Sequence, residues 1–312
     1  MFSKAPVGTS YRVLEHVKGD HTHSSAVFKA QVVSRENARG VPEVPGWRRL
    51  VMDMQLRICN VRVLIYGLPG VASAKCFRKM YERIDDSTIA LEWSDTTLAE
   101  SVLKAAFRSC VVLEDHKHVE YLVLTSWHLP ITPDYKPANI LLSNIYTNRV
   151  IAKVGDLGLV VPVGELLNAQ PYAMRAPEVF LGKACTEPSQ VWAVAAMLLC
   201  WIKPGVLGAW ESPHPILNEA CGSFPHWDIP TPRKEHGDIV SVAIKSAQAF
   251  SKDMPELQMI SPFDEETQKV EMPQQLRELL RFILAPDPKA RPSASSVLAS
   301  REFRDFEHYV SV

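Results

Sequence analysis

Short apolar runs of the kind that form β-strands occupy the first third of the chain. These runs are rich in β-branched and aromatic residues, which favour strands, and they cover residues 11–14, 26–30, 32–33 and 87–93. Residues 50–66 fit neither the strand nor the helix period, and the Leu-Pro-Gly triplet at 68–70 is typical of a turn. The pattern predicts a small, strand-rich region that ends near residue 94.

From residue 97 onward the spacing of the apolar residues becomes helical. Residues 191–202 are apolar all round, which is typical of a helix buried on every side. Residues 276–284 carry an apolar stripe at helical spacing. Strands followed by helices indicate an α+β protein with two lobes, formed by residues 1–93 and 94–312.

The composition narrows the class of partner and the compartment. The net charge of the 312 residues is −1, without a basic patch of the kind that binds nucleic acid or a membrane surface. The six cysteines include no Cys-x-x-Cys pair, and no secretory signal or membrane-spanning run is visible. We therefore expect an intracellular protein, cytoplasmic or nuclear, that binds neither nucleic acid nor a membrane.

Three short motifs stand in one order in the second part of the chain. They are Asp134-Tyr-Lys136-Pro-Ala-Asn139, Asp156-Leu-Gly158 and Arg175-Ala-Pro-Glu178. Transfer of a phosphoryl group needs a carboxylate that orients the attacking hydroxyl, a cation near the phosphate and oxygen ligands for Mg²⁺. The first two motifs offer these groups together.

These motifs resemble the catalytic core of eukaryotic protein kinases. In motif they are most similar to the group of the SR-protein kinases, within the CMGC kinases, which also carry an arginine before Ala-Pro-Glu. The resemblance implies a bilobal fold with ATP and Mg²⁺ as cofactors. It also implies that Asp134 orients the hydroxyl, Lys136 stabilises the γ-phosphate, and Asn139 and Asp156 hold the metal.

The same resemblance assigns further residues. Nucleotide-binding positions fall on Gly19, Val27, Glu92, Trp93 and Asp156. A structural role falls on Glu178, which we expect to form a buried, bidentate ion pair with Arg291.

The first lobe departs from the kinase pattern. Its phosphate loop retains one glycine, Gly19, and no lysine occurs between Lys29 and Lys75 to clamp the phosphates. Arg48, Arg49 and Arg57 are the candidate substitute cations, although a guanidinium does not simply replace an ammonium.

The second lobe also departs from the pattern, in three places. Thr132-Pro133 replaces the usual His-Arg before the catalytic aspartate. Gln190 replaces the central-helix aspartate that normally braces the catalytic loop. Residues 121–130 look like extra sequence.

Three functions remain open. The first is a protein kinase that transfers the γ-phosphoryl group of Mg-ATP to serine and threonine hydroxyls of an unidentified protein. The second is a catalytically impaired pseudokinase that acts as a binding scaffold. The third is a small-molecule phosphotransferase, although enzymes of that class lack the Ala-Pro-Glu segment that is present here. Residues 264–266, Asp-Glu-Glu, are either an acidic dock for basic peptides or the solvated start of a helix. The oligomeric state is open.

Overall fold

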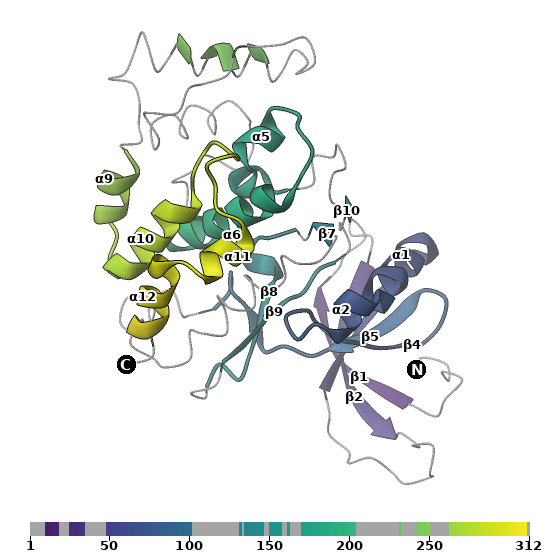
Figure 1. The fold of residues 1–312 in the computed structure, drawn as a ribbon. Coiled ribbons are helices and arrows are strands. Elements are labelled where there is room, and N and C mark those ends of the chain that lie inside the picture. The colour runs from purple at the N-terminus through teal and green to yellow at the C-terminus, as the bar shows by residue number, and fades with distance from the viewer. Residues whose placement is uncertain are drawn as a thin grey trace. The chain divides into compact units, whose positions relative to one another are not determined.

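The chain divides into two compact units, of which the first is built on strands and the second mainly on helices (Figure 1). The first unit comprises Met1–Asp95 with Gly155–Gly158, and the second comprises Thr96–Val154 with Leu159–Val312. The computed structural model describes residues 10–18, 25–34, 48–101, 131–132, 134–146, 150–157, 161–162, 170–203, 231, 241–242, 244–246, 248–249 and 262–310. The predicted α+β class is confirmed.

A five-stranded antiparallel sheet forms the first unit, in the order β1-β2-β3-β5-β4. Its strands are β1 (Ser10–Lys18), β2 (Ser25–Ser34), β3 (Arg48–Met54), β4 (Met80–Arg83) and β5 (Thr88–Glu92). One face is closed by a small apolar core of Ala30, Val51, Ile84 and Ala90, against which Tyr11 and Phe28 pack. This sheet takes up the strands predicted at the start of the chain.

Residues 50–66, left unassigned from the sequence, contain the end of β3 and most of helix α1 (Leu56–Gly67). The helix has apolar residues on its exposed side as well, including Leu64 and Val61, so no single stripe reveals it. Its first residue lacks a side-chain cap. The turn predicted at 68–70 is wrong: Pro69 begins the short helix α2 (Pro69–Ser73), at the first position, where proline is favoured.

The second unit combines small sheets with helices. The strands are β6 (Thr96–Thr97), β7 (Ile131–Thr132), β8 (Ile140–Ser143), β9 (Ile151–Val154) and β10 (Val161–Pro162), paired as β6-β8-β9 and β10-β7. The helices are η2 (Pro137–Asn139), η3 (Tyr172–Met174), α5 (Pro177–Phe180), α6 (Glu187–Ile202), α9 (Phe263–Gln268), α10 (Gln274–Ile283), α11 (Ala294–Leu298) and α12 (Arg301–Tyr309). The helix expected from residue 97 is wrong at its start, because Thr97 belongs to β6. Its remainder and the segment 121–130 lie outside the described residues.

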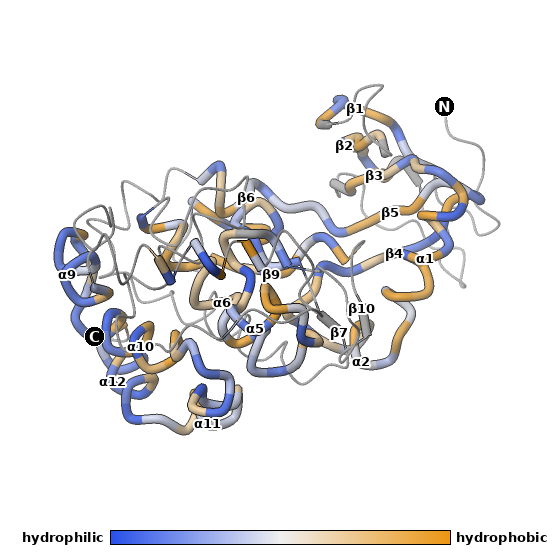
Figure 2. Tube along the Cα trace, turned by 90° about the horizontal axis from the view of Figure 1, so that it is seen from above, coloured by the Kyte–Doolittle hydropathy of each residue, from blue (hydrophilic) through white to orange (hydrophobic). Residues whose placement is uncertain are grey.

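Helix α6 is the buried centre of the second unit. Residues 189–197 are all buried, as the all-round apolar pattern predicts. Its first turn is closed by a reciprocal capping box between Thr186 and Ser189. Around it, α10 presents an apolar stripe inward and polar residues outward, and both kinds are visible along the helix in Figure 2. None of the helices in the described part of the chain has the length and hydrophobicity needed to traverse a bilayer.

The acidic triplet at 264–266 has a structural role that neither sequence interpretation anticipated. Glu266 is buried and forms ion pairs with Lys203 and Lys269. Asp264 is paired with Arg281. Of the three acidic residues, Asp264 and Glu265 are exposed. Glu266 is therefore neither a solvated charge nor part of an open dock.

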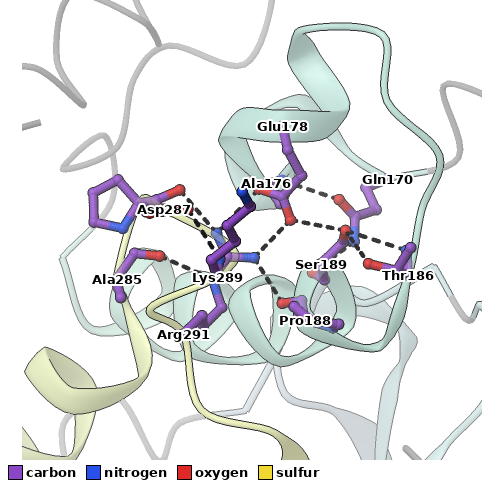
Figure 3. A network of polar contacts seen from close by, with 11 residues as sticks. Gln170, Ala176, Glu178, Thr186, Pro188, Ser189, Ala285, Asp287, Lys289 and Arg291 are labelled. Atoms are coloured by element: carbon purple, nitrogen blue, oxygen red, sulfur yellow. Dashed lines mark hydrogen bonds and ion pairs between the residues drawn. The ribbon is translucent and has the colours of Figure 1, made fainter. Parts of the chain in front are cut away.

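The ion pair expected between Glu178 and Arg291 is present and bidentate (Figure 3). Arg291 Nη1 donates to Glu178 Oε1 at 2.7 Å and Nη2 to Oε2 at 3.0 Å. Both side chains are almost completely buried. Arg291 also donates to the carbonyl oxygens of Pro188, Ala285 and Pro286. One guanidinium thus joins α5, the start of α6 and the segment that follows α10.

Two buried glutamines of the second unit differ in how their amides are satisfied. Gln170 Nε2 donates to the Ser189 carbonyl at 2.9 Å, and its Oε1 accepts from the Ala176 amide at 3.0 Å. Gln190, in contrast, is fully buried, and neither of its side-chain polar atoms has a hydrogen-bond partner within the described structure. An unpaired buried amide costs stability.

We predict that Glu178→Gln lowers the free energy of unfolding by about 3–5 kcal/mol, because it leaves the buried Arg291 charge uncompensated. Arg301→Ala, which breaks the exposed pair with Asp305, should change it by less than about 0.5 kcal/mol. Urea unfolding of the three proteins measures both effects. Equal losses would show that burial does not set the value of the pair.

We predict that Gln190→Met raises the free energy of unfolding by about 1–2 kcal/mol, because it removes two unpaired polar atoms at similar volume. Gln170→Met should lower it by about 1–3 kcal/mol, because it leaves the Ala176 amide and the Ser189 carbonyl without partners. The same urea titration compares them. If Gln190→Met lowered the free energy of unfolding as Gln170→Met does, the Gln190 amide would have hydrogen-bond partners after all.

Candidate functional site

The structure brings three of the predicted catalytic residues together in one loop of the second unit. Lys136 Nζ donates to Asp134 Oδ2 at 2.6 Å, and Asn139 Nδ2 donates to Asp134 Oδ2 at 3.1 Å and to its backbone oxygen at 2.8 Å. Asp134 and Asn139 are buried, whereas Lys136 is about one-third exposed. The carboxylate is therefore held in place by two donors, one of which carries a positive charge.

Local sequence explains why the loop folds back on itself. Pro137 begins the single turn η2, which returns Asn139 toward Asp134. Tyr135, in the middle of the loop, is fully buried, and the first three residues of β8, which follows the loop, are buried as well. The Leu98 amide donates to the Ile140 carbonyl at 2.7 Å, which fixes the end of the loop.

Asp156 follows β9 and belongs to the first unit, where helix α1 holds its segment at two points. Arg62 Nη2 lies 3.1 Å from Asp156 Oδ1, and the Tyr66 hydroxyl donates to the Gly155 carbonyl at 2.8 Å. Arg62 and Tyr66 are four positions apart, so they share one face of the helix. The predicted metal ligand is thus ion-paired with an arginine of α1.

The strand register identifies Met52 of β3 as the sheet residue that Arg62 contacts. Met52 of β3 lies opposite Val27 of β2 and Ile89 of β5, and residues opposite one another share a face. Arg62 Nη1 donates to Met52 Sδ at 3.3 Å. The Met52 thioether of β3 therefore contacts the Arg62 guanidinium. The positive charge paired with Asp156 comes from helix α1.

Sequence reasoning missed Arg62. Of the candidate cations, Arg57 is exposed, and the side chains of Arg48 and Arg49 lie outside the described residues. The signal that could have found Arg62 is its spacing of four from Tyr66, which places two polar groups on one face of an apolar helix.

Two of the predicted nucleotide-binding residues of the first unit, Glu92 and Trp93, lie at the end of β5. Lys29 Nζ lies 5.0 Å from the centre of the Trp93 ring, in cation–π geometry. Glu92 accepts from the Lys79 amide through its carboxylate at 3.1 Å, and from Arg78 Nε through its backbone oxygen at 2.9 Å. Val27 lies on β2, opposite Met52, while Gly19 lies outside the described residues.

Two buried groups next to Asp156 have shifted pKa values. Burial raises the pKa of Tyr66 to about 12, and the nearby charges of Arg78 and Arg62 oppose this shift. Burial likewise lowers the pKa of Arg78, against the favourable fields of Tyr66, Glu92 and Asp156. Arg78 therefore adds a second positive charge close to Asp156.

Asn139 of the second unit and Asp156 of the first unit each offer an oxygen of the kind that Mg²⁺ prefers. The Asn139 amide nitrogen is used in hydrogen bonds to Asp134, which leaves its amide oxygen as the ligand atom. Asp156 offers carboxylate oxygens, and its side chain is nearly half exposed. Mg²⁺ prefers a few such oxygens together with substrate phosphates. Within the described ranges, no group of three or more His, Cys, Asp or Glu residues forms another metal site.

Comparisons with known proteins show a likeness to protein kinases. No protein-family model matches the chain. The chain is 26% identical over 197 residues to the stress-activated protein kinase JNK of Drosophila melanogaster. The matched region covers 58% of this chain and 48% of that protein. It thus spans about half the length of this curated relative. Among solved structures, the crystal structure of a kinase domain matches with a TM-score of 0.66 at 15% identity, covering 94% of this chain and 95% of the other.

We predict a pH dependence from Tyr66. Its folded-state pKa is raised above the ordinary value of 10, so the folded protein holds the phenolic proton more tightly than the unfolded chain. The stability that this group contributes is fully present below pH 10 and is lost as the pH rises toward 12. Tyr66→Phe should cost about 1 kcal/mol at pH 8, through the lost bond to Gly155.

The measurement is the free energy of unfolding of the wild type and Tyr66→Phe between pH 8 and pH 11. The wild type should lose stability more steeply above pH 10 than the variant. Tyr146→Phe, at an exposed tyrosine, serves as the control and should follow the wild type. Parallel curves for wild type and Tyr66→Phe would show that Tyr66 is not protected.

Proposed function

We propose that this protein kinase-like domain transfers the γ-phosphoryl group of ATP to serine and threonine hydroxyls of a protein substrate. The observation that carries the proposal is the hydrogen-bonded set of Asp134, Lys136 and Asn139. Its members have the chemistry that phosphoryl transfer asks of a protein, namely orientation of the nucleophile and neutralisation of charge.

Asp134 is the residue that orients the attacking hydroxyl. Its carboxylate is buried and fixed by Lys136 and Asn139, so little reorganisation is needed when a hydroxyl group donates to it. Lys136 donates to this carboxylate and places an ammonium where charge on the transferred phosphate is stabilised.

Mg²⁺, when bound through Asn139 and Asp156, supplies neutralisation of the phosphate charge during transfer. The chain's own contribution is to hold these two side chains. Asn139 is fixed by its bonds to Asp134, and the Asp156 segment is fixed by the bond from Tyr66 to Gly155.

The setting that we propose for this activity is inside the cell, in the cytoplasm or the nucleus. The cysteines in the described part of the chain, at positions 59, 76, 185 and 200, are buried thiols. Reduced thiols are typical of a reducing compartment. The partners are ATP and a protein substrate, and the composition favours neither nucleic acid nor a membrane surface.

A second candidate function is a binding scaffold with little turnover. The observation that favours it is that Arg62 is paired with Asp156, while no lysine occurs between Lys29 and Lys75. A catalytically impaired domain would keep the fold and the nucleotide contacts without transferring phosphate.

We predict that Asp134→Asn lowers the rate of phosphoryl transfer at least about 100-fold, because the orienting carboxylate is lost, while ATP still binds. The assay follows transfer from radiolabelled ATP to mixed basic and acidic test proteins in the presence of Mg²⁺, with ATP binding measured by the shift in Tm. Asp86→Asn, at an exposed carboxylate, is the matched control and should transfer phosphate like the wild type.

Two results would contradict kinase activity. Transfer that is equal in the wild type and in Asp134→Asn would place the chemistry elsewhere. ATP binding without transfer to any test protein or to the chain itself would favour the scaffold.

A further inference from the structure

Arg62 keeps most of its hydrogen-bonding capacity unused, although its side chain is nine-tenths buried. One of its nitrogens, Nη2, faces Asp156 at 3.1 Å. Another, Nη1, donates to the sulfur of Met52, and a thioether is a weak acceptor. The third, Nε, is buried without a hydrogen-bond partner in the described structure. A guanidinium with these contacts is short of strong acceptors, and buried donors normally have one.

The charges around Arg62 indicate which acceptor suits it. Arg78 is a second guanidinium in the same electrostatic neighbourhood, and both interact with Asp156. Glu92 also faces Arg78, and Arg78 Nε is bonded to the Glu92 backbone oxygen. Arginine recognises phosphate through paired N–H donors better than lysine does. An anionic phosphate oxygen is therefore the acceptor that satisfies Arg62.

We propose that Arg62 is the phosphate-binding residue of the nucleotide site and that ATP binds to this protein without a divalent cation. This inference rests on the proposed nucleotide binding and extends it. Arg62 supplies a positive charge from α1, next to Met52 of β3. The ion pair with Asp156 positions the guanidinium, and the phosphates take Nη donors, one of which has only the Met52 sulfur as a weak acceptor.

The same ion pair sets Arg62 and Mg²⁺ in competition for Asp156. A guanidinium 3.1 Å from Oδ1 occupies one side of the carboxylate, and a divalent cation placed beside it is repelled. Mg²⁺ must therefore weaken the Arg62–Asp156 contact in order to bind. Without Arg62, this repulsion is removed, and nucleotide binding should depend on Mg²⁺.

The experiment measures binding of ATP and of adenosine to the full chain by calorimetry, in EDTA and in Mg²⁺. The wild type should bind ATP in EDTA at least as tightly as in Mg²⁺. Arg62→Ala should weaken ATP binding in EDTA by about 10- to 100-fold, as expected for lost bonds to a charged group. It should leave adenosine, which has no phosphate, unchanged, and Mg²⁺ should restore part of its ATP affinity. Arg57→Ala, at an exposed arginine of the same helix, is the matched control and should equal the wild type.

Several outcomes overturn the inference. The first is that the wild type binds ATP only when Mg²⁺ is present. Comparing its ATP affinity in EDTA and in Mg²⁺ needs no variant. Another is an equal loss of ATP and adenosine in Arg62→Ala, which would make Arg62 structural. If Arg62→Ala does not fold, Arg62→Lys replaces it, because lysine keeps the positive charge. Arg62→Lys should still bind ATP in EDTA, although more weakly than the wild type. Complete loss of ATP binding in this variant contradicts the proposal. Absence of any nucleotide binding by the wild type would defeat the proposed function itself.

Discussion

The second unit depends on a single buried ion pair. Arg291 and Glu178 come from segments more than a hundred residues apart, and their bidentate contact is closed to water. The Arg291 guanidinium also takes up carbonyl oxygens at the start of α6 and after α10, and Ser189 donates to Glu178 at 2.9 Å. Two charges with this many partners tolerate burial, whereas either charge alone does not. The arrangement of α5 against the first turn of α6 follows from that requirement.

The two units differ in how far their residues keep the kinase pattern. In the second unit, Asp134, Lys136 and Asn139 are hydrogen-bonded to one another within one loop. In the first unit, Arg62 of helix α1 contacts Met52 of β3 and is paired with Asp156. The residues that we propose to orient the hydroxyl are thus kept together, whereas the phosphate contact that we propose comes from a helix.

The sequence predicted what local patterns and short motifs determine. Helix α6 was predicted because every side of it is apolar, and the pair of Glu178 and Arg291 because both lie in recognisable motifs. Helix α1 was not predicted, because its apolar residues point both outward and inward. Arg62 was missed because its partner Asp156 is far away in the sequence and its neighbour Met52 carries no signal of a polar contact. The unpaired amide of Gln190 follows from packing alone, which no pattern of residue types encodes.

Helix α1 connects these observations to the mobility of the site. It begins without a side-chain cap, has no acidic residue in its first turn, and contains several β-branched residues, so it has little intrinsic tendency to be helical. Arg62 and Tyr66, the two residues that hold the Asp156 segment, lie within one turn of it. If that turn unwinds, both contacts are lost together. The Asp156 segment therefore stays ordered only while a helix that depends on its neighbours stays folded.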